Sequence, residues 1–395
     1  MSMPARVPIL GEPVAGRVPV HPVLGKGFRP FFLLAAVFAA SILPIWMLAL
    51  LGVLQPGVHL DAVGWHGHEM VFGFAGAVVA GFLLTAVANW TGRETLTGLP
   101  LAALALLWLA GRVAQVLPVP DLLSEMVELA FLPLLAVAIA RPLVLSGNRK
   151  NFVMVAVLVA LWTADLMVYS PQWRQRGLAL GVDLLTLLIV VFAGRVLPMF
   201  TRNGTGVASI RSSPRLDVLA IVSVACVTGI DLALPGTLAA GLAAAAASLL
   251  VAARTVRWGT RHALRVPLLW ILHAGYAFIP IGLALRAASV LGAPVPPSAA
   301  THALTAGAIG CMTLGMMARV ALGHSGRMLA VGRPMALAFA AVVVGAVVRV
   351  IGPLSPTTYR PALFIAGTLW TLAFATYAVV YAPIVLAPRI DGKPG

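Results

Sequence analysis

The stretch WHGHEMVFGFAGAVVAGFLLTAVANW (65–90) opens with two histidines and a glutamate and then continues without a charge. The uncharged part has about 20 residues, which is the length that a helix needs to cross a bilayer. Similar segments occur along the whole chain. They lie near 28–54, 66–89, 99–117, 121–140, 151–170, 177–197, 215–234, 237–257, 265–291, 298–322, 333–352 and 358–388. We therefore expect an all-α, polytopic integral membrane bundle of about 12 transmembrane helices.

The composition excludes the common soluble classes of protein. Of the 395 residues, 61% are hydrophobic and 10% are charged, and the mean hydropathy is +0.99. A soluble globular chain has about 45–50% apolar and about 25% charged residues. The two cysteines, Cys226 and Cys311, lie within apolar runs, so we expect packing residues and no disulfide framework.

Basic residues predict the orientation in the membrane. One set of helix ends carries most of them: Arg6, Arg17, Lys26, Arg29, Arg93, Arg141, Arg149, Lys150, Arg202, Arg211, Arg215, Arg254, Arg257, Arg261, Arg265, Arg327, Arg333, Arg389 and Lys393. The opposite loops carry Arg174, Arg176 and Arg360. The positive-inside rule then places both termini in the cytoplasm. We expect cytoplasmic tails at 1–27 and 389–395 around one transmembrane domain at 28–388. The same distribution favours membrane lipid, and no nucleic acid, as the partner of the +15 net charge.

The chain also contains a weak internal sequence similarity. The cytoplasmic ends of the second, sixth and tenth segments read TAVANWTGR (85–93), RVLPMFTR (195–202) and RVALGHSGR (319–327). Gapless alignment of the first and last places His68 opposite His302. Weak self-similarity is typical of repeats in membrane proteins. It suggests pseudo-threefold order with three units of four helices, although Gly, Ser, Thr and Arg are common at any such helix end.

Ionisable side chains gather in the outer half of the predicted bundle. This set comprises His66, His68, Glu69, Arg112, Glu125, Glu128, Asp165, Asp183, Asp231, Arg286, His302 and Arg349. Charges within a bilayer are costly and usually functional. The sequence therefore predicts a polar site near the extracytoplasmic surface.

The histidines are the most informative members of this set. His66 and His68 are two residues apart, so on a helix they point in directions about 200° apart and serve different partners. His302 lies at a similar depth and can face one of them. Neutral imidazoles on facing helices in an apolar cavity suit a haem iron or a copper ion. His273 and His324 form a second candidate pair nearer the inner surface.

Arginines and carboxylates suggest supporting roles. Arg112, Arg286 and Arg349 could hold haem propionates, and the alternative is that they pair with nearby acids. Several carboxylates at the same level, such as Glu69, Glu125 and Glu128, could relay protons from the outer surface. The sequence has no CxxCH motif for covalent haem and no phosphate-binding loop, so an electron donor would be a membrane quinol or an extracytoplasmic partner.

Four stretches resemble the NnrS family. They are KGFRPFFLLAAVFAA (26–40), WHGHEMVFGFAGAVVAGFLLTAVANWTGR (65–93), LWILHAGYAFIPIGL (269–283) and THALTAGAIGCMTLGMMARVALGHSGR (301–327). The resemblance implies a bacterial membrane protein that contains haem and copper and is linked to nitric oxide metabolism and nitrosative-stress resistance. Its histidine motifs fall on His66, His68, His273, His302 and His324. It does not say which of them bind haem and which bind copper.

Catalytic subunits of haem-copper oxidases and respiratory nitric oxide reductases show a fainter likeness. They too have twelve helices, and their haem ligands come from the second and tenth. Here His66-Gly67 is followed by Met70, and His302 opens the tenth segment. The chain departs from their pattern because the tenth segment has one histidine in place of HxH and the seventh has none. We treat the likeness as one of architecture.

Together these observations predict a membrane haem protein of the bacterial cytoplasmic membrane that binds nitric oxide in its outer half. We expect His302 and one of His66 and His68 to hold a b-type haem, and the other to contribute to a second metal site. The expected cofactors are haem b and copper. Three functions remain open. The protein reduces nitric oxide, it senses or handles nitric oxide without turnover, or it is a secondary transporter.

Overall fold

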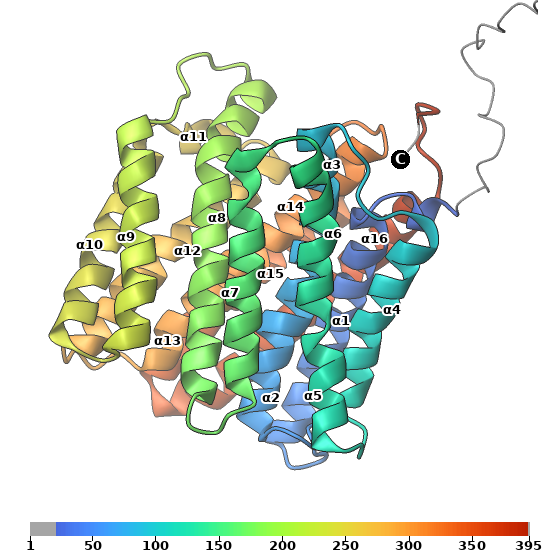
Figure 1. Cartoon of the computed structure of the whole chain (residues 1–395). Helices are drawn as coiled ribbons and strands as arrows, with labels where there is room; N and C mark the ends of the chain where they lie inside the picture. The colour runs from blue at the N-terminus through green and yellow to red at the C-terminus, as the bar shows by residue number, and fades with distance from the viewer. Residues whose placement is uncertain (1–20, 394–395) are drawn as a thin grey trace, which may run out of the picture.

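The computed structural model describes residues 21–393, and all regular secondary structure in this range is helical (Figure 1). The first half contains α1 (Phe28–Leu50), α2 (Ala62–His68), α3 (Gly76–Thr91), α4 (Gly98–Ala114), α5 (Asp121–Leu129), α6 (Phe131–Leu145), α7 (Val153–Val168) and α8 (Arg174–Thr205). The second half contains α9 (Pro214–Ala233), α10 (Leu238–Arg254), α11 (Thr260–Ala263), α12 (Pro267–Val290), α13 (Pro297–His302), α14 (Gly310–His324), α15 (Arg333–Ile351) and α16 (Pro356–Leu386). Short 3₁₀ turns lie at Pro22–Leu24, Arg149–Asn151, Thr255–Arg257 and Gly352–Leu354.

The all-α membrane bundle expected from hydropathy is confirmed. Within the described residues, 11 continuous helical segments are long and apolar enough to cross a membrane. The expected segment 99–117 is helix α4, which is also apolar but has 17 residues. The chain is thus a multi-pass membrane protein whose helices agree closely with the predicted segments.

Two of the spans change their helical geometry part-way. α2 continues into a π-helical segment at Glu69–Ala75 (η2) and then into α3. α13 continues in the same way into a π-helical segment at Ala303–Ile309 (η5) and then into α14. The residue before each segment is a histidine, His68 or His302, which are the two residues that gapless alignment pairs. By contrast, α8, the sixth span, is α-helical throughout.

The first and last helices bring the two ends of the described chain together. α1 packs along α16, and the fully buried Arg29 at the start of α1 closes this contact. Its Nη1 donates to the carbonyl oxygens of Val385 at 2.7 Å and Ala387 at 2.6 Å. Both ends therefore lie at one end of the bundle, as an even number of crossings requires. Residues 1–20 of the expected N-terminal tail and 394–395 of the C-terminal tail are outside the described residues.

The opposite end of the bundle, which we call the histidine end, carries α2, α5 and α13 (bottom of Figure 1). Asp61 caps α2 there, accepting from the backbone N–H of Gly64 at 2.9 Å. It also pairs with Arg174 at the start of α8, with Nη1 and Oδ2 2.5 Å apart. The Gly64 N–H and, after it, the Arg174 guanidinium hold the pKa of Asp61 below its usual value. These contacts fix α2, and hence both histidines, against α8.

Candidate functional site

A cavity of about 310 Å³ lies at the histidine end. This volume is at the lower end of the range of about 300–1,000 Å³ for ligand and cofactor pockets. Its polar lining comprises His66, Gln175, Arg286, Thr301, His302, Thr305 and Arg349. Its apolar lining includes Trp46, Met70, Phe74, Val182, Ile309 and Trp370. The cavity therefore brings together two histidines and two arginines from four helical spans within a mainly apolar wall.

His302 presents one free ring nitrogen. Its Nδ1 lies 2.6 Å from the carbonyl oxygen of Ser298, one helical turn earlier. Because a carbonyl oxygen accepts only, Nδ1 carries the proton and Nε2 keeps its lone pair. A backbone carbonyl that holds Nδ1 in this way is the usual support of a histidine that binds metal through Nε2. His302 is thus set up as a ligand by its own helix.

His66 enters the same cavity from α2. Its ring stacks on the indole of Trp46, with centroids 4.5 Å apart and planes 8° from parallel. Its Nδ1 is buried, and no described residue hydrogen-bonds to it. A buried ring nitrogen without a partner costs free energy unless a ligand or water completes it. His66 and His302 are therefore the cavity's two candidate ligands for one metal or cofactor.

The two arginines of the cavity differ in their surroundings. Arg286 is held by acids: Nη2 lies 2.7 Å from Oδ1 of Asp183, and Nη1 lies 2.5 Å from Oδ2 of Asp231. Arg349 lies over the ring of Tyr359, 5.7 Å from its centroid. Its Nη1 is buried and has no partner among the described residues. Arg349 is thus the cavity's better candidate for binding an anionic group.

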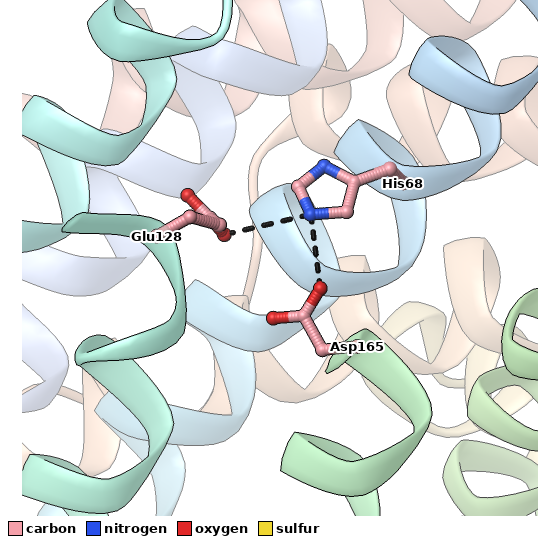
Figure 2. Close-up of side chains that lie close together, drawn as sticks. All are labelled: His68, Glu128 and Asp165. Carbon is pink, nitrogen blue, oxygen red and sulfur yellow. Dashed lines mark hydrogen bonds and ion pairs between the residues drawn. The ribbon is translucent and has the colours of Figure 1, made fainter. Parts of the chain in front are cut away.

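His68 points away from the cavity into a separate group that we call the acid cluster: His68, Glu69, Arg112, Glu128 and Asp165. Figure 2 shows the His68 imidazole between Glu128 and Asp165. Its Nε2 lies 3.0 Å from Oδ1 of Asp165 and 3.7 Å from Oε1 of Glu128, and its Nδ1 lies 3.1 Å from Oε1 of Glu69. The two-residue spacing thus sends His66 and His68 to different sites.

Arg112 joins two carboxylates of the acid cluster. Its Nη1 lies 3.0 Å from Oε2 of Glu69, and its other terminal nitrogen pairs with Glu128. Glycines make room for this contact, since a Cβ at Gly73 would collide with Arg112 and one at Gly111 with Glu128. Arg112, which we expected as a propionate anchor, thus takes the alternative role of pairing with acids and does not line the cavity.

The acid cluster carries an excess of negative charge. Its three carboxylates, Glu69, Glu128 and Asp165, are at most 4% exposed, and they face one guanidinium. With neutral His68 the formal sum is minus two, and with protonated His68 it is minus one. Burying net charge is costly unless a counter-ion or protons neutralise it. One ligand atom each from His68, Glu128 and Asp165 lies within 4.8 Å of the others, so these residues can bind a cation.

A hydrogen-bonded path leads from this cluster toward the histidine end. The hydroxyl of Tyr169 lies 3.3 Å from Nε2 of His68 and accepts from Nε2 of Gln115 at 2.6 Å. The backbone carbonyl of Gln115 in turn accepts from the N–H of Val58 at 3.5 Å. Tyr169 and Gln115 were not predicted from the sequence, because a tyrosine or glutamine near a helix end carries no signal by itself.

The remaining predicted residues lie elsewhere. Glu125 is half-buried on α5; it does not line the cavity, and it does not belong to the described group of possible metal ligands. His273 binds the hydroxyls of Thr201 at 2.8 Å and Thr260 at 3.1 Å. His324 packs its ring against Phe28, with centroids 5.8 Å apart.

No hydrogen bond joins His273 and His324 in the described part of the chain. Each histidine has its own set of neighbours, and the inner pair stays a prediction.

A comparison with known protein families identifies the family of this chain. A sequence model described as NnrS protein matches residues 22–389. The chain belongs to the NnrS family. Membership indicates a metal-binding membrane protein linked to the nitric oxide response. Among curated proteins, none matches this NnrS-family chain.

Proposed function

We propose that this NnrS-family protein binds a b-type haem in the cavity between His66 and His302 and binds nitric oxide there. The observation that carries the proposal is the pairing of His302, whose Nε2 is free, with His66, whose buried Nδ1 lacks a partner. A haem would supply an iron that binds nitric oxide. The apolar wall would exclude competing water from that position.

Different cavity residues would then hold different parts of the haem. His302 would bind the iron through Nε2 in the orientation that Ser298 holds, and Trp46 keeps the His66 ring parallel to its own. Arg349 would bind a propionate through its unpaired Nη1. Arg286 is already neutralised by two aspartates, so it contributes a weaker anchor at the same wall.

We further propose that the acid cluster supports reduction of nitric oxide. Two molecules of nitric oxide, two electrons and two protons give nitrous oxide and water. A membrane quinol or an extracytoplasmic donor supplies the electrons, and the acid cluster stores the protons or binds the copper ion near them. Handling or sensing of nitric oxide without turnover uses the same cavity and is the alternative. A secondary transporter is disfavoured because the cavity offers metal ligands. The location is the bacterial cytoplasmic membrane, with both termini in the cytoplasm.

The first experiment is an optical spectrum of the detergent-purified protein, oxidised, dithionite-reduced and then exposed to nitric oxide. We expect reduced b-type bands that shift with nitric oxide. His302→Ala should lose these bands, and added imidazole should restore them. His59→Ala removes a half-buried histidine at the same end but outside the cavity, and it should keep them. Unchanged bands in His302→Ala would refute the assignment.

A second experiment separates turnover from binding. Haem-loaded protein is given a quinol and nitric oxide, and nitrous oxide is measured. Production that falls at least ~10-fold in Asp165→Asn while the haem bands persist supports reduction through the acid cluster. Nitric oxide binding without nitrous oxide identifies a handling or sensing protein.

A further inference from the structure

A second cavity, of about 110 Å³, lies between α3, α8 and α14, farther from the histidine end than the first. Its wall includes Phe32, Val78, Phe82, Leu188, Phe192 and Met312. The one hydroxyl that lines it belongs to Thr313, and that hydroxyl is bonded to the carbonyl of Gly310 at 3.0 Å. Among the described residues, the second cavity therefore offers an apolar surface whose one hydroxyl already donates its proton to a backbone carbonyl.

The two cavities are stacked along the same three spans. Val182 on α8 lines the first cavity, and Leu185, one turn on, lines the second. Phe74 and Ala75 are neighbours in η2 and line one cavity each. Ile309 lines both and is 5% exposed. Its side chain therefore lies between the two cavities, which follow one another along the same three spans.

The far wall of the second cavity reaches the lipid-facing side of the bundle. Phe82 on α3 and Phe192 on α8 are half-buried, and their rings meet edge to face with centroids 4.9 Å apart. Phe82 follows His68 by fourteen residues, which is about 21 Å along a helix. This aromatic contact thus lies deep in the span, where lipid tails surround the bundle.

We infer that this second cavity is a passage by which nitric oxide, an uncharged diatomic gas, reaches the first cavity from the lipid, past Ile309. The inference rests on the proposed function for its destination. An apolar cavity of this size stays dry and takes up small apolar guests such as xenon. Its described lining offers no free hydrogen-bond donor and one hydroxyl whose proton is already engaged. This disfavours a quinol headgroup or a chain of water molecules, so protons and gas reach the site by separate routes.

Xenon tests the passage without any cofactor. Crystals or detergent-solubilised protein under xenon pressure should hold xenon in the second cavity. Ala193→Leu adds carbon atoms to a fully buried wall position and should abolish that occupancy. Ala220→Leu is a matched control, since Ala220 is also fully buried but does not line either cavity. An empty second cavity in the folded wild-type protein would overturn the inference.

Carbon monoxide recombination after flash photolysis then measures the rate at which a small gas enters the haem-loaded protein. Ile309→Phe should slow the bimolecular rate at least 10-fold, whereas Ile309→Leu, which conserves volume, should change it less than 2-fold. Equal rates in all three proteins would overturn the passage even if xenon binds. If haem is absent but xenon is bound and is lost in Ala193→Leu, the passage stands as an apolar guest site and the proposed haem function fails.

Discussion

Replacing Arg112 by methionine tests the charge balance of the acid cluster most directly. Methionine fills a similar volume but removes the one guanidinium that faces three buried carboxylates. Glu128→Gln is the opposite perturbation, because it removes one negative charge and leaves an amide that still accepts from Arg112. The two variants break the same ion pair. Arg112→Met leaves the negative Glu128 without its partner, whereas Glu128→Gln leaves the positive Arg112.

The structure sets the expected magnitudes. With neutral His68, Arg112→Met makes the buried formal charge more negative, from minus two to minus three, and breaking a buried pair costs about 3–5 kcal/mol. Glu128→Gln reduces the negative charge to minus one, so the free energy of unfolding should change by about 1 kcal/mol or less. The double variant should recover at least half of the Arg112→Met loss, since it removes one of the two carboxylates left without a cation.

The assay is thermal unfolding in detergent, followed by tryptophan fluorescence, with membrane insertion checked for each variant. Arg215→Met is the control, because Arg215 is exposed at the start of α9, and its midpoint should stay near that of the wild type. A Glu128→Gln midpoint at or below that of Arg112→Met would refute the reasoning. It would mean that the cluster lacks negative charge, not positive charge.

Three further outcomes are expected. Asp61→Ala removes the cap of α2 and should cost about 1 kcal/mol at neutral pH. The deficit in melting temperature should narrow as the pH falls through the lowered pKa of Asp61, because protonation then breaks the Arg174 pair in the wild type too; a deficit independent of pH would contradict this. Trp46→Leu removes the surface on which His66 stacks and should raise the rate of haem loss to apomyoglobin at least ~3-fold. Glu125→Gln should leave nitrous oxide production unchanged, and a large loss would place Glu125 in the proton path.

Much of the architecture follows from hydropathy alone. Apolar runs of bilayer length predicted the spans, and the gap between the expected segments 99–117 and 121–140 falls between α4 and α5. The two-residue spacing of His66 and His68 predicted that they serve different partners. These predictions succeed because they depend on local length and periodicity, which a single sequence contains.

The partners of each polar residue could not be predicted in the same way. Arg112 had several carboxylates at its depth, and the choice of Glu69 and Glu128 depends on how α4 rotates against η2 and α5. Trp46 was not predicted because an indole in an apolar helix looks like any packing residue. The π-helical segments were missed because no residue in either marks a change from four-residue to five-residue hydrogen bonding.

Those two segments have a consequence for how the site tolerates insertions and deletions. A π turn holds one residue more than the α turn that it replaces, so deleting one residue from Ala303–Ile309 would let the span become a continuous α-helix. The part before the deletion would keep roughly its orientation relative to the part after it, because the π turn already accommodates the extra residue. One residue deleted from the regular helix of α14 would instead rotate His302 by about 100° relative to the rest of the span. In an alignment, a one-residue gap within either π-helical segment would thus be compatible with an unchanged site, whereas the same gap in the regular helix that follows would turn the histidine away from it.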